Sequence, residues 1–385
     1  MPVMRVLLAF DKFKNALSAR AACTIAAEAL RAAHPTWKID SCPLTDGGDG
    51  FAEILTRAAN GELRSISVAG PRGAPVVAAL GLVWTEKIPA AARPQLDLAP
   101  DDASVAIVEM AAASGLALLS PAQRDPWLTT SLGTGELIAA AAKMNASAIL
   151  LGVGGSATND LGLGALAALG LGFHSAAGEK IYPPAPARWN DIASIAGAVS
   201  PTLPPIRIAC DVSNPLLGPR GCTTVFGPQK GLRAADRSRL EHASARLALM
   251  LCAHSGQPDI LMDAPGAGAA GGIGFGLMAA ARAKLLPGFD LIAAWLDLET
   301  RIAAADIVMT GEGRFDESSR AGKAPGAVAS RALALGRRVH IFAGEIAAVI
   351  APPFIAHAIT PPGEPLEHAL REAGANLAAA IRRAF

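Results

Sequence analysis

Carboxylates, amides and lysines follow most of the apolar segments that are typical of strands in this 385-residue sequence. Because the carboxyl ends of parallel strands share one edge of a sheet, we expect these side chains to gather there. Lysines neutralise phosphate charge, carboxylates hold Mg²⁺, and one further carboxylate can accept a proton, so the set predicts phosphoryl transfer. The residues are Asp11, Lys12, Lys14, Asp46, Asp49, Asp211, Asn214, Gln229, Lys230, Glu312, Asp316 and Lys323.

Each of these positions also has a simpler interpretation when it is taken alone. Asp46 and Asp49 are typical of Gly-Asp turns, and Asn214 precedes Pro215 as turn-starting residues do. Lys12 and Lys14 are equally compatible with a solvated surface. The chemical interpretation therefore depends on all of them meeting at one edge.

Three glycine clusters form a second kind of candidate site: "GVGGSA" at 152–157, "GAGAAGG" at 266–272 and "GEGRFD" at 311–316. Backbone N–H groups in such turns form anion-binding nests, and a following helix adds its positive end, so phosphate is the expected ligand. The alternative is that the glycines only permit tight turns and close packing. The P-loop pattern G-x-x-x-x-G-K-[ST] does not occur, so any phosphate is bound in another arrangement.

Composition limits the possible classes of function. Hydrophobic residues make up 51% and charged residues 17%, and the net charge is +1, which argues against disorder and against a nucleic-acid or membrane-surface partner. Aromatic residues make up only 4%, so base-stacking surfaces are not expected. The five cysteines lack metal-type spacing, and no signal peptide stands out. The uncharged segment at 264–281 carries six glycines, so we expect a loop that leads into a buried helix and not a membrane span. These features predict a cytoplasmic protein.

Apolar runs alternate with helical patterns at both ends of the chain, as in βαβ units, with strands expected at 5–10, 37–43, 306–311 and 338–344. The first helix is expected to begin at Ser18, and the last to span 366–384. The middle has strands separated by short turns, which favours a mixed sheet. We therefore predict an α/β fold: a doubly wound, Rossmann-like parallel-sheet domain (1–74 and 286–385) and an inserted α/β domain with a mixed sheet (75–285). The active site is expected in the cleft between them.

The successive motifs of the chain resemble those of the bacterial glycerate kinase family, the type that makes 2-phosphoglycerate. The similar segments are "DKFKNALSA", "PLTDGGDG", "GVGGSATNDLGLGALAALG", "CDVSNPLLGPRGCTTVFGPQKG", "PGAGAAGGIGFG" and "TGEGRFDESSRAGKAP". They occur in the family's order and span nearly the whole chain. Two positions depart from its pattern: Lys12 stands where serine is usual, and Asp49 where glutamate is common. The resemblance implies ATP, Mg²⁺ and D-glycerate, with transfer to the 2-hydroxyl.

Within that function, the glycine clusters are expected to bind the nucleotide and the acids to bind metal or accept the proton. The nucleotide residues are Gly154, Gly155, Ser156, Thr158, Gly268, Gly271, Gly272 and Lys323. The metal ligands are Glu312, with Asp316 and Asp160 in support, and Asp160 is expected at the start of a helix. The catalytic residues are Asp211, Asp46, Lys14 and Lys230, and the substrate-binding residues are Asn214, Gln229 and Lys12.

The proton acceptor is assigned to Asp211, because it directly follows an apolar strand and is expected to be half-buried with a tunable pKa. Asp46 is the other candidate. Lys14 and Lys230 are expected to face the transferred phosphate and the glycerate carboxylate, in an order that the sequence leaves open.

Two other functions remain as alternatives. The dinucleotide patterns G-x-G-x-x-A at 152–157 and G-x-G-x-x-G at 266–272 fit a nicotinamide-dependent oxidoreductase of a small hydroxy acid. A two-domain protein that binds a hydroxy acid without catalysis is the other. The oligomeric state stays open, with a homodimer as one candidate.

Overall fold

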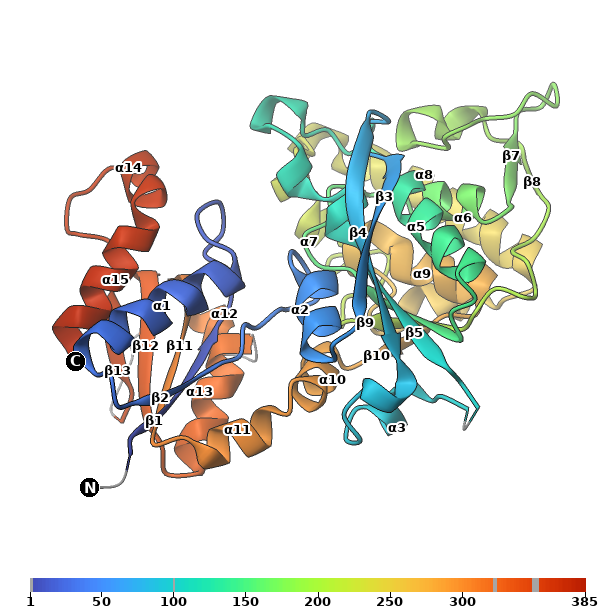
Figure 1. The fold of residues 1–385 in the computed structure, drawn as a ribbon. Helices are drawn as coiled ribbons and strands as arrows, with labels where there is room; N and C mark the ends of the chain where they lie inside the picture. The colour runs from blue at the N-terminus through green and yellow to red at the C-terminus, as the bar shows by residue number, and fades with distance from the viewer. Residues whose placement is uncertain (1–2, 100, 321–323, 348–352) are drawn as a thin grey trace. The chain divides into compact units, whose positions relative to one another are not determined.

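The chain forms two compact α/β units in a computed structural model that describes residues 3–99, 101–320, 324–347 and 353–385 (Figure 1). Unit 1 comprises Met1–Asp46 and Ile292–Phe385, and unit 2 comprises Gly47–Leu291. The division differs from the sequence-based boundaries, because residues 47–74 and 286–291 belong to unit 2. The reason lies in β3 (Glu62–Ala69), which pairs along its whole length with β4 (Pro75–Trp84).

Unit 1 contains a five-stranded, wholly parallel sheet in the order β13-β12-β11-β1-β2. From β1 the chain moves to β2 on one side, and it later returns to β11 on the other. The order therefore reverses between β1 and β11, which is the place where open α/β sheets bind ligands beyond the carboxyl ends of their strands. The strands are β1 (Arg5–Phe10), β2 (Lys38–Ser41), β11 (Ile307–Phe315), β12 (Arg338–Ile346) and β13 (Ile355–Ala358).

Helices cover both faces of this sheet, as predicted for a doubly wound domain (Figure 1). On one face, α1 (Ala19–Ala33) and α15 (Ala373–Ala384) pack together over the buried side chains of β1. On the other, α11 (Leu298–Ala304) and α13 (Ala324–Ala334) pack against β1 and β11. The predicted start of the first helix is confirmed by Ser18, whose Oγ accepts a hydrogen bond from Ala21 N at 3.1 Å.

The last helix of the prediction, 366–384, is in fact two helices. The first, α14, spans Leu366–Arg371, and α15 begins at Ala373 after a break at Glu372. Gly374, a poor helix former, lies directly after the break.

Unit 2 contains a six-stranded mixed sheet in the order β10-β9-β6-β5-β4-β3, which confirms the prediction from its short, turn-separated strands. Three neighbouring pairs, β5–β6, β6–β9 and β9–β10, are parallel, whereas β3 and β4 form an antiparallel ribbon. The carboxyl ends of four strands therefore share one edge. They are β5 (Ser104–Glu109), β6 (Ala148–Gly152), β9 (Ile206–Ala209) and β10 (Lys284–Leu286).

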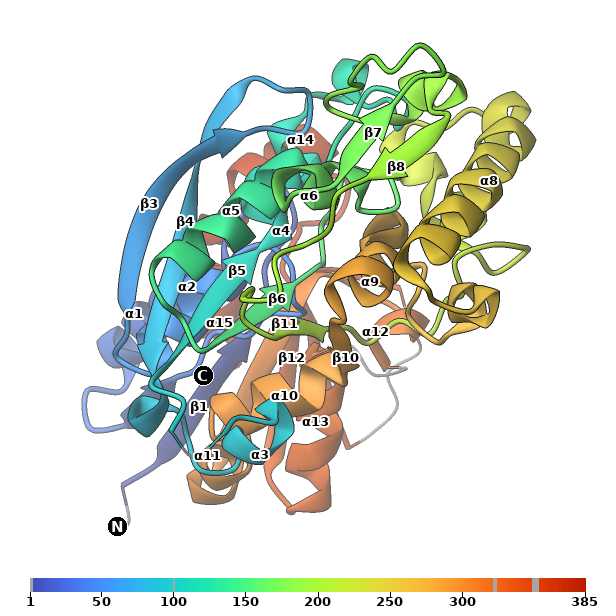
Figure 2. The ribbon, with the colours of Figure 1, turned by 90° about the vertical axis from the view of Figure 1, so that its right-hand side faces the viewer.

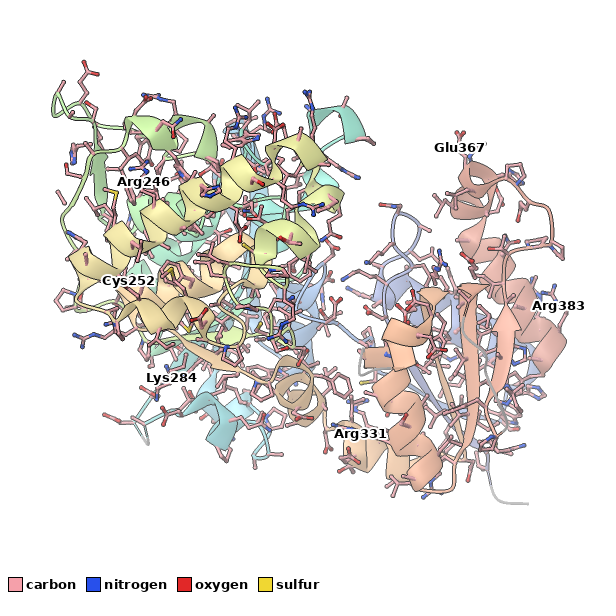
Figure 3. The ribbon with its side chains drawn as sticks, turned by 180° about the vertical axis from the view of Figure 1, so that it is seen from behind. Arg246, Cys252, Lys284, Arg331, Glu367 and Arg383 are labelled. Carbon is pink, nitrogen blue, oxygen red and sulfur yellow. The ribbon has the colours of Figure 1, made fainter. Side chains whose placement is uncertain are left out.

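Helices also cover both faces of the mixed sheet. α2 (Phe51–Ala58) packs against β4 and β5, and α5 (Leu132–Lys143) lies on the opposite face (Figure 2). Beyond α5 come α6 (Leu163–Ala168), α9 (Ala269–Ala281) and α8 (Arg237–Ser255), which packs along α9. Arg246, on α8, donates to the carbonyl oxygens of Trp189 and Ile192 and so holds the segment between β7 (Gly172–His174) and β8 (Ser194–Ala196). Arg246 is labelled in Figure 3.

The remaining elements are short. They are β7 (Gly172–His174), β8 (Ser194–Ala196), α3 (Arg93–Leu96), α4 (Met110–Ser114), α7 (Cys222–Phe226), α10 (Gly288–Trp295), α12 (Glu317–Arg320) and the 3₁₀ turns η1 (Thr85–Lys87), η2 (Leu116–Leu118), η3 (Pro121–Gln123), η4 (Pro186–Asp191), η5 (Pro228–Lys230), η6 (Ala234–Asp236) and η7 (Asp259–Asp263).

None of the helices in the described ranges combines the length and the apolar character needed to span a bilayer. The uncharged segment at 264–281 forms, as predicted, a loop that leads into the buried helix α9.

Candidate active site

A glycine-lined loop follows β6 at the shared carboxyl edge of unit 2. Its glycines lie against another backbone: Gly154 N donates to Gly47 O at 3.0 Å. A Cβ on Gly152 would lie 2.5 Å from Gly47 O, and a Cβ on Gly154 would lie 2.7 Å from Gly48 N. These two glycines are therefore required by the close approach of the turn at 47–48, which belongs to the "DGGDG" motif.

Gly155 has a different environment. Its φ is +71°, and a Cβ there would lie 3.6 Å from both carboxylate oxygens of Asp49. Positive φ favours glycine. The two 3.6 Å distances show that the Asp49 carboxylate lies beside Gly155 in this loop.

Lys230 holds this loop from inside unit 2. It lies in η5 and is 1% exposed, and its Nζ donates to Ser156 Oγ at 2.9 Å and to Thr158 O at 2.6 Å. Burial lowers the pKa of Lys230 to about 8. The ammonium group of Lys230 thus binds two groups of the protein, and its predicted contact with a substrate anion stays a prediction.

Thr158 is itself fully buried, and its Oγ1 has no hydrogen-bond partner among the described residues. Ser156 is 7% exposed, so both predicted phosphate-binding hydroxyls are covered by the protein.

Asp160 is fully buried at the far end of the loop. One oxygen accepts hydrogen bonds from Ser131 N (2.7 Å), Ser131 Oγ (2.8 Å) and Gly164 N (3.3 Å), and the other accepts from Gly162 N (3.2 Å). Burial raises the pKa of Asp160, and these donors oppose the shift. The residue precedes α6 as predicted, and its oxygens join the starts of α5 and α6. Its role as a metal ligand stays a prediction.

The second glycine cluster packs against this same loop. Gly271 has φ +77°, and a Cβ there would lie 2.0 Å from Thr158 O. A Cβ on Gly272 would lie 2.9 Å from Leu161 Cδ2, and one on Gly268 would lie 2.3 Å from Pro215 O. Close packing therefore requires glycine at Gly268, Gly271 and Gly272, and their contact with nucleotide stays a prediction.

Asp211, the predicted proton acceptor, follows β9 at the same carboxyl edge. Asp211 was predicted to be half-buried, but it is exposed, because it lies in a loop beyond the strand. Its Oδ1 accepts a hydrogen bond from Phe289 N at 3.0 Å, which fixes the carboxylate against the chain after β10. Nearby in sequence, Asn214 Nδ2 donates to Arg220 O at 2.7 Å. Gln229 is exposed.

Unit 1 has its own acidic cluster at the point where its strand order reverses. Asp11 directly follows β1 and is 5% exposed. Burial and then the neighbouring carboxylate of Asp46 raise the pKa of Asp11 to about 7, Lys12 opposes the shift, and Glu312 adds to it. Lys12 Nζ binds Asp46 Oδ1 at 2.8 Å. Asp11 lies at this strand end as expected, and its residue type and position alone indicate no particular role.

Glu312 lies inside β11, whereas the sequence predicted that it would lie just after the end of this strand. The strand continues to Phe315, and Glu312 pairs in register with Ala343 of β12. The third glycine cluster is therefore part of a strand: a Cβ on Gly311 would lie 1.7 Å from Phe342 O. Glu312 is nevertheless buried beside Asp11, because β1 and β11 are neighbours.

The other predicted residues of unit 1 are less closely connected to this cluster. Asp316 Oδ1 accepts a hydrogen bond from Ser319 N at 3.2 Å, as is typical at a helix start, and Lys14 is exposed. Lys323 lies outside the described residues.

The acids of unit 1 fit Mg²⁺, although the described ranges contain no group of three His, Cys, Asp or Glu side chains arranged for a metal ion. Mg²⁺ keeps several waters and is held by one or two carboxylates together with substrate phosphates, so a complete protein ligand set is not needed. Asp11, Asp46 and Glu312 supply carboxylates within electrostatic reach of one another.

Neither dinucleotide pattern has the structure that would support an oxidoreductase. The second, at 266–272, follows the 3₁₀ turn η7 and not a strand. After Gly152–Ala157 the chain forms a loop, and α6 starts only at Leu163. In a dinucleotide site the glycines would open a helix directly after the strand.

Comparisons with known proteins identify the family of the chain. Residues 6–385 match the model of the glycerate kinase family. The chain is 38% identical to the glycerate kinase of Bacillus subtilis (strain 168) over 346 residues, covering 89% of this chain and 85% of the relative. It is also 38% identical to the glycerate 2-kinase of Escherichia coli (strain K12) over 347 residues, covering 89% of this chain and 86% of the relative.

A solved structure, the glycerate kinase 2 of Salmonella typhimurium LT2, is similar in fold with a TM-score of 0.75 and 36% identity, covering 100% of this chain and 97% of that one. The chain is thus a kinase of the α/β fold class, in which the sheet of unit 1 is parallel and the larger sheet of unit 2 is mixed. The chain belongs to the glycerate kinase family.

Proposed function

We propose that this chain transfers the γ-phosphoryl group of ATP to the 2-hydroxyl of D-glycerate, giving 2-phospho-D-glycerate and ADP. The observation that carries the proposal is the similarity, over 86% of its length, to the Escherichia coli protein named glycerate 2-kinase. The small-molecule substrate and the use of ATP follow from membership of the family.

In this proposal, the acidic cluster of unit 1 holds the metal that accompanies ATP. Glu312 and Asp46 are the candidate ligands, with Asp11 buried beside them. Bound Mg²⁺ would neutralise charge on the β- and γ-phosphates. Lys12, paired with Asp46, and Lys14 add positive charge at the same strand end. Asp316 is a weaker candidate ligand, because it caps the turn at Ser319.

The loop at 154–158 in unit 2 is the candidate phosphate-binding segment. Its support is local: Gly155 has a positive φ, and Lys230 places a positive charge directly behind Ser156. We assign Lys230 and Asp160 to holding the loop in place, since the polar atoms of both bind protein groups. Because little covalent chemistry is needed in phosphoryl transfer, such positioning is a large part of catalysis.

Asp211 remains the candidate proton acceptor, with Asn214 and Gln229 as candidate glycerate ligands. The exposed carboxylate of Asp211 is fixed in orientation by Phe289 N, and this suits a group that must meet a hydroxyl at a defined angle.

We also assign the protein to the cytoplasm, where ATP is available. The thiols agree with a reducing compartment, since all five cysteines are free.

The test is an ADP-release assay with ATP, MgCl₂ and D-glycerate, followed by ³¹P NMR of the product. We expect ADP formation that depends on D-glycerate, and a phosphorus signal coupled to the single C2 proton. A signal coupled to the two C3 protons would overturn the position of transfer. No ADP release above the rate with ATP alone would overturn the function, and L-glycerate and tartronate measure the selectivity for the acceptor.

A further inference from the structure

The two glycine turns of unit 2 come from distant parts of the sequence and touch through their backbones. Gly154 N donates to Gly47 O, and neither Gly152 nor Gly154 has room for a Cβ against the turn at 47–48. Any displacement of the first turn is therefore transmitted to the second. What holds the first turn decides the position of both.

One buried carboxylate, Glu109, supplies that anchor. It is the last residue of β5, it is 7% exposed, and it pairs in register with Gly152 of β6. Its Oε1 accepts a hydrogen bond from Gly50 N at 3.2 Å, and its Oε2 accepts one from Ala52 N at 3.1 Å. The two oxygens thus bind backbone donors on both sides of Phe51, where α2 begins.

The start of α2 has no capping side chain of its own. Gly50 occupies the N-cap position with φ +91°, so it has no side chain to offer, and its conformation needs an external restraint. Glu109 fills this role from a neighbouring strand, and the positive end of the helix favours its negative charge.

Asp49 connects Glu109 to the candidate site, because it directly precedes Gly50, whose N–H Glu109 binds. The Asp49 carboxylate lies beside Gly155, as the 3.6 Å distances to a Cβ on Gly155 indicate. Glu109 therefore fixes, through Gly50 and Ala52, where Asp49 stands relative to the loop at 154–158. No local pattern signals this role, because Glu109 lies at the end of an apolar segment as several other acids of the chain do.

We propose that Glu109 is a positioning residue for phosphoryl transfer, which locks the turn at 47–52 against the loop at 152–156 so that the two form one rigid phosphate-binding edge. This inference rests on the proposed function for its catalytic consequence. Its structural consequence, the coupling of the two turns, stands without it.

The test compares Glu109→Gln with the wild type. Glutamine has nearly the same shape, but its amide NH₂ faces a backbone N–H that needs an acceptor, so one of the two hydrogen bonds is lost. Glu109→Asp keeps the charge with a shorter reach and serves as a milder second variant if the glutamine variant folds poorly. Asp97→Asn is the matched control, because Asp97 pairs with Arg207 and with Lys284, near the amino ends of β9 and β10 and so away from the shared carboxyl edge. Lys284 is labelled in Figure 3.

The first measurement is amide hydrogen exchange without ligand. Faster exchange at Gly50 and Ala52 is expected from any loss of their acceptor. The informative position is Gly154, whose N–H Glu109 does not touch: we expect its exchange to accelerate at least tenfold in Glu109→Gln, less in Glu109→Asp, and not at all in Asp97→Asn. Wild-type exchange at Gly154 in both Glu109 variants would overturn the coupling.

The second measurement is steady-state kinetics at a temperature where all variants are folded by circular dichroism. We expect kcat/KM for ATP to fall at least tenfold in Glu109→Gln, while KM for glycerate changes less than twofold and Asp97→Asn matches the wild type. Equal loss for both substrates, or no loss, would overturn the positioning role. If the wild type itself released no ADP with glycerate, the proposed function would fail, while the exchange result would still decide the coupling.

Discussion

Lys230 Nζ lies 2.9 Å from Ser156 Oγ and 2.6 Å from the carbonyl oxygen of Thr158, in a position that is 1% exposed. A buried ammonium group is costly unless its hydrogens are bound, and here the glycine loop itself binds two of them. Burial also lowers the pKa of Lys230 to about 8, so the charge is retained at neutral pH. The lysine and the loop therefore stabilise each other.

Replacement of Lys230 by methionine tests this relationship. The change leaves Ser156 Oγ and Thr158 O without their buried donor, which costs about 1–3 kcal/mol for an unsatisfied group. We expect kcat to fall about 100-fold, since phosphoryl transfer depends on exact placement of the phosphates. Kinetics and thermal unfolding are compared with Lys284→Met, which removes an exposed lysine of the same unit. Equal behaviour of the two variants would show that Lys230 has no special role.

Gly271 offers a test of the packing between α9 and the loop. In Gly271→Ala the new Cβ meets Thr158 O at 2.0 Å, and the φ of +77° is also unfavourable for alanine. Gly178→Ala is a matched control, since Gly178 has φ +82° and nothing within 4 Å of the new Cβ. We expect the control to lose about 1 kcal/mol from backbone conformation alone.

The Gly271 variant should lose at least about 2 kcal/mol more than this control, because overpacking adds a cost of that size. Urea unfolding measures both. Similar midpoints for the two variants would mean that the loop moves aside freely, and would contradict its description as a rigid segment.

Much of this fold could be predicted from apolar periodicity, and the reason is visible in unit 1. The run at 5–10 is β1 residue for residue, and Ser18 caps α1 as its type and place suggested. Short apolar runs between helical patterns leave few alternatives to a parallel sheet. The unit boundary was harder to place, because it depends on β3 pairing with β4, which is a tertiary contact.

The sequence says less about the environment of the candidate site residues, and for a physical reason. Residue type shows that Lys230 and Asp160 are polar, but not whether their partners are ligands or protein backbone. Burial decides this, and both turn inward. In the same way, the glycines at 268–272 fit a nucleotide pattern, while the atoms they approach belong to neighbouring segments of the chain. Glu109 had no local signal at all, since its partners are 57 and 59 residues away in sequence.

The raised pKa of Asp11 predicts that the stability of the metal-free protein depends on pH. Burial, Asp46 and Glu312 raise the pKa of Asp11 from 3.8 to about 7 against the opposing charge of Lys12. A raised pKa means that between about pH 4 and 7 the folded state holds a proton that the unfolded state has lost, so the contribution of Asp11 to stability declines as pH rises. The decline is at most about 4 kcal/mol for a shift of about three pH units.

Asp11→Asn removes this titration, because asparagine stays neutral at every pH. We expect the wild type to lose stability relative to the variant between pH 4.5 and pH 8, measured by urea unfolding in EDTA. A constant difference between the two proteins over this range would show that Asp11 titrates as an ordinary carboxyl.

The proton acceptor is tested by a pair of variants that keep shape and remove basicity. Asp211→Asn retains an oxygen that can accept from Phe289 N, so the loop after β10 should stay in place. If Asp211 accepts the hydroxyl proton, kcat should fall about 100-fold or more, the usual size of a general-base contribution, while ATP binding changes little.

Asp46→Asn breaks the ion pair with Lys12 and should weaken ATP binding in the presence of Mg²⁺. Rapid-quench kinetics and calorimetric titration with ATP separate the two effects. If Asp211→Asn weakened ATP binding and left kcat intact, Asp211 would be a nucleotide-binding residue. A fall in kcat confined to Asp46→Asn would make Asp46 the proton acceptor, because loss of the acceptor slows the chemical step without weakening the binding of ATP.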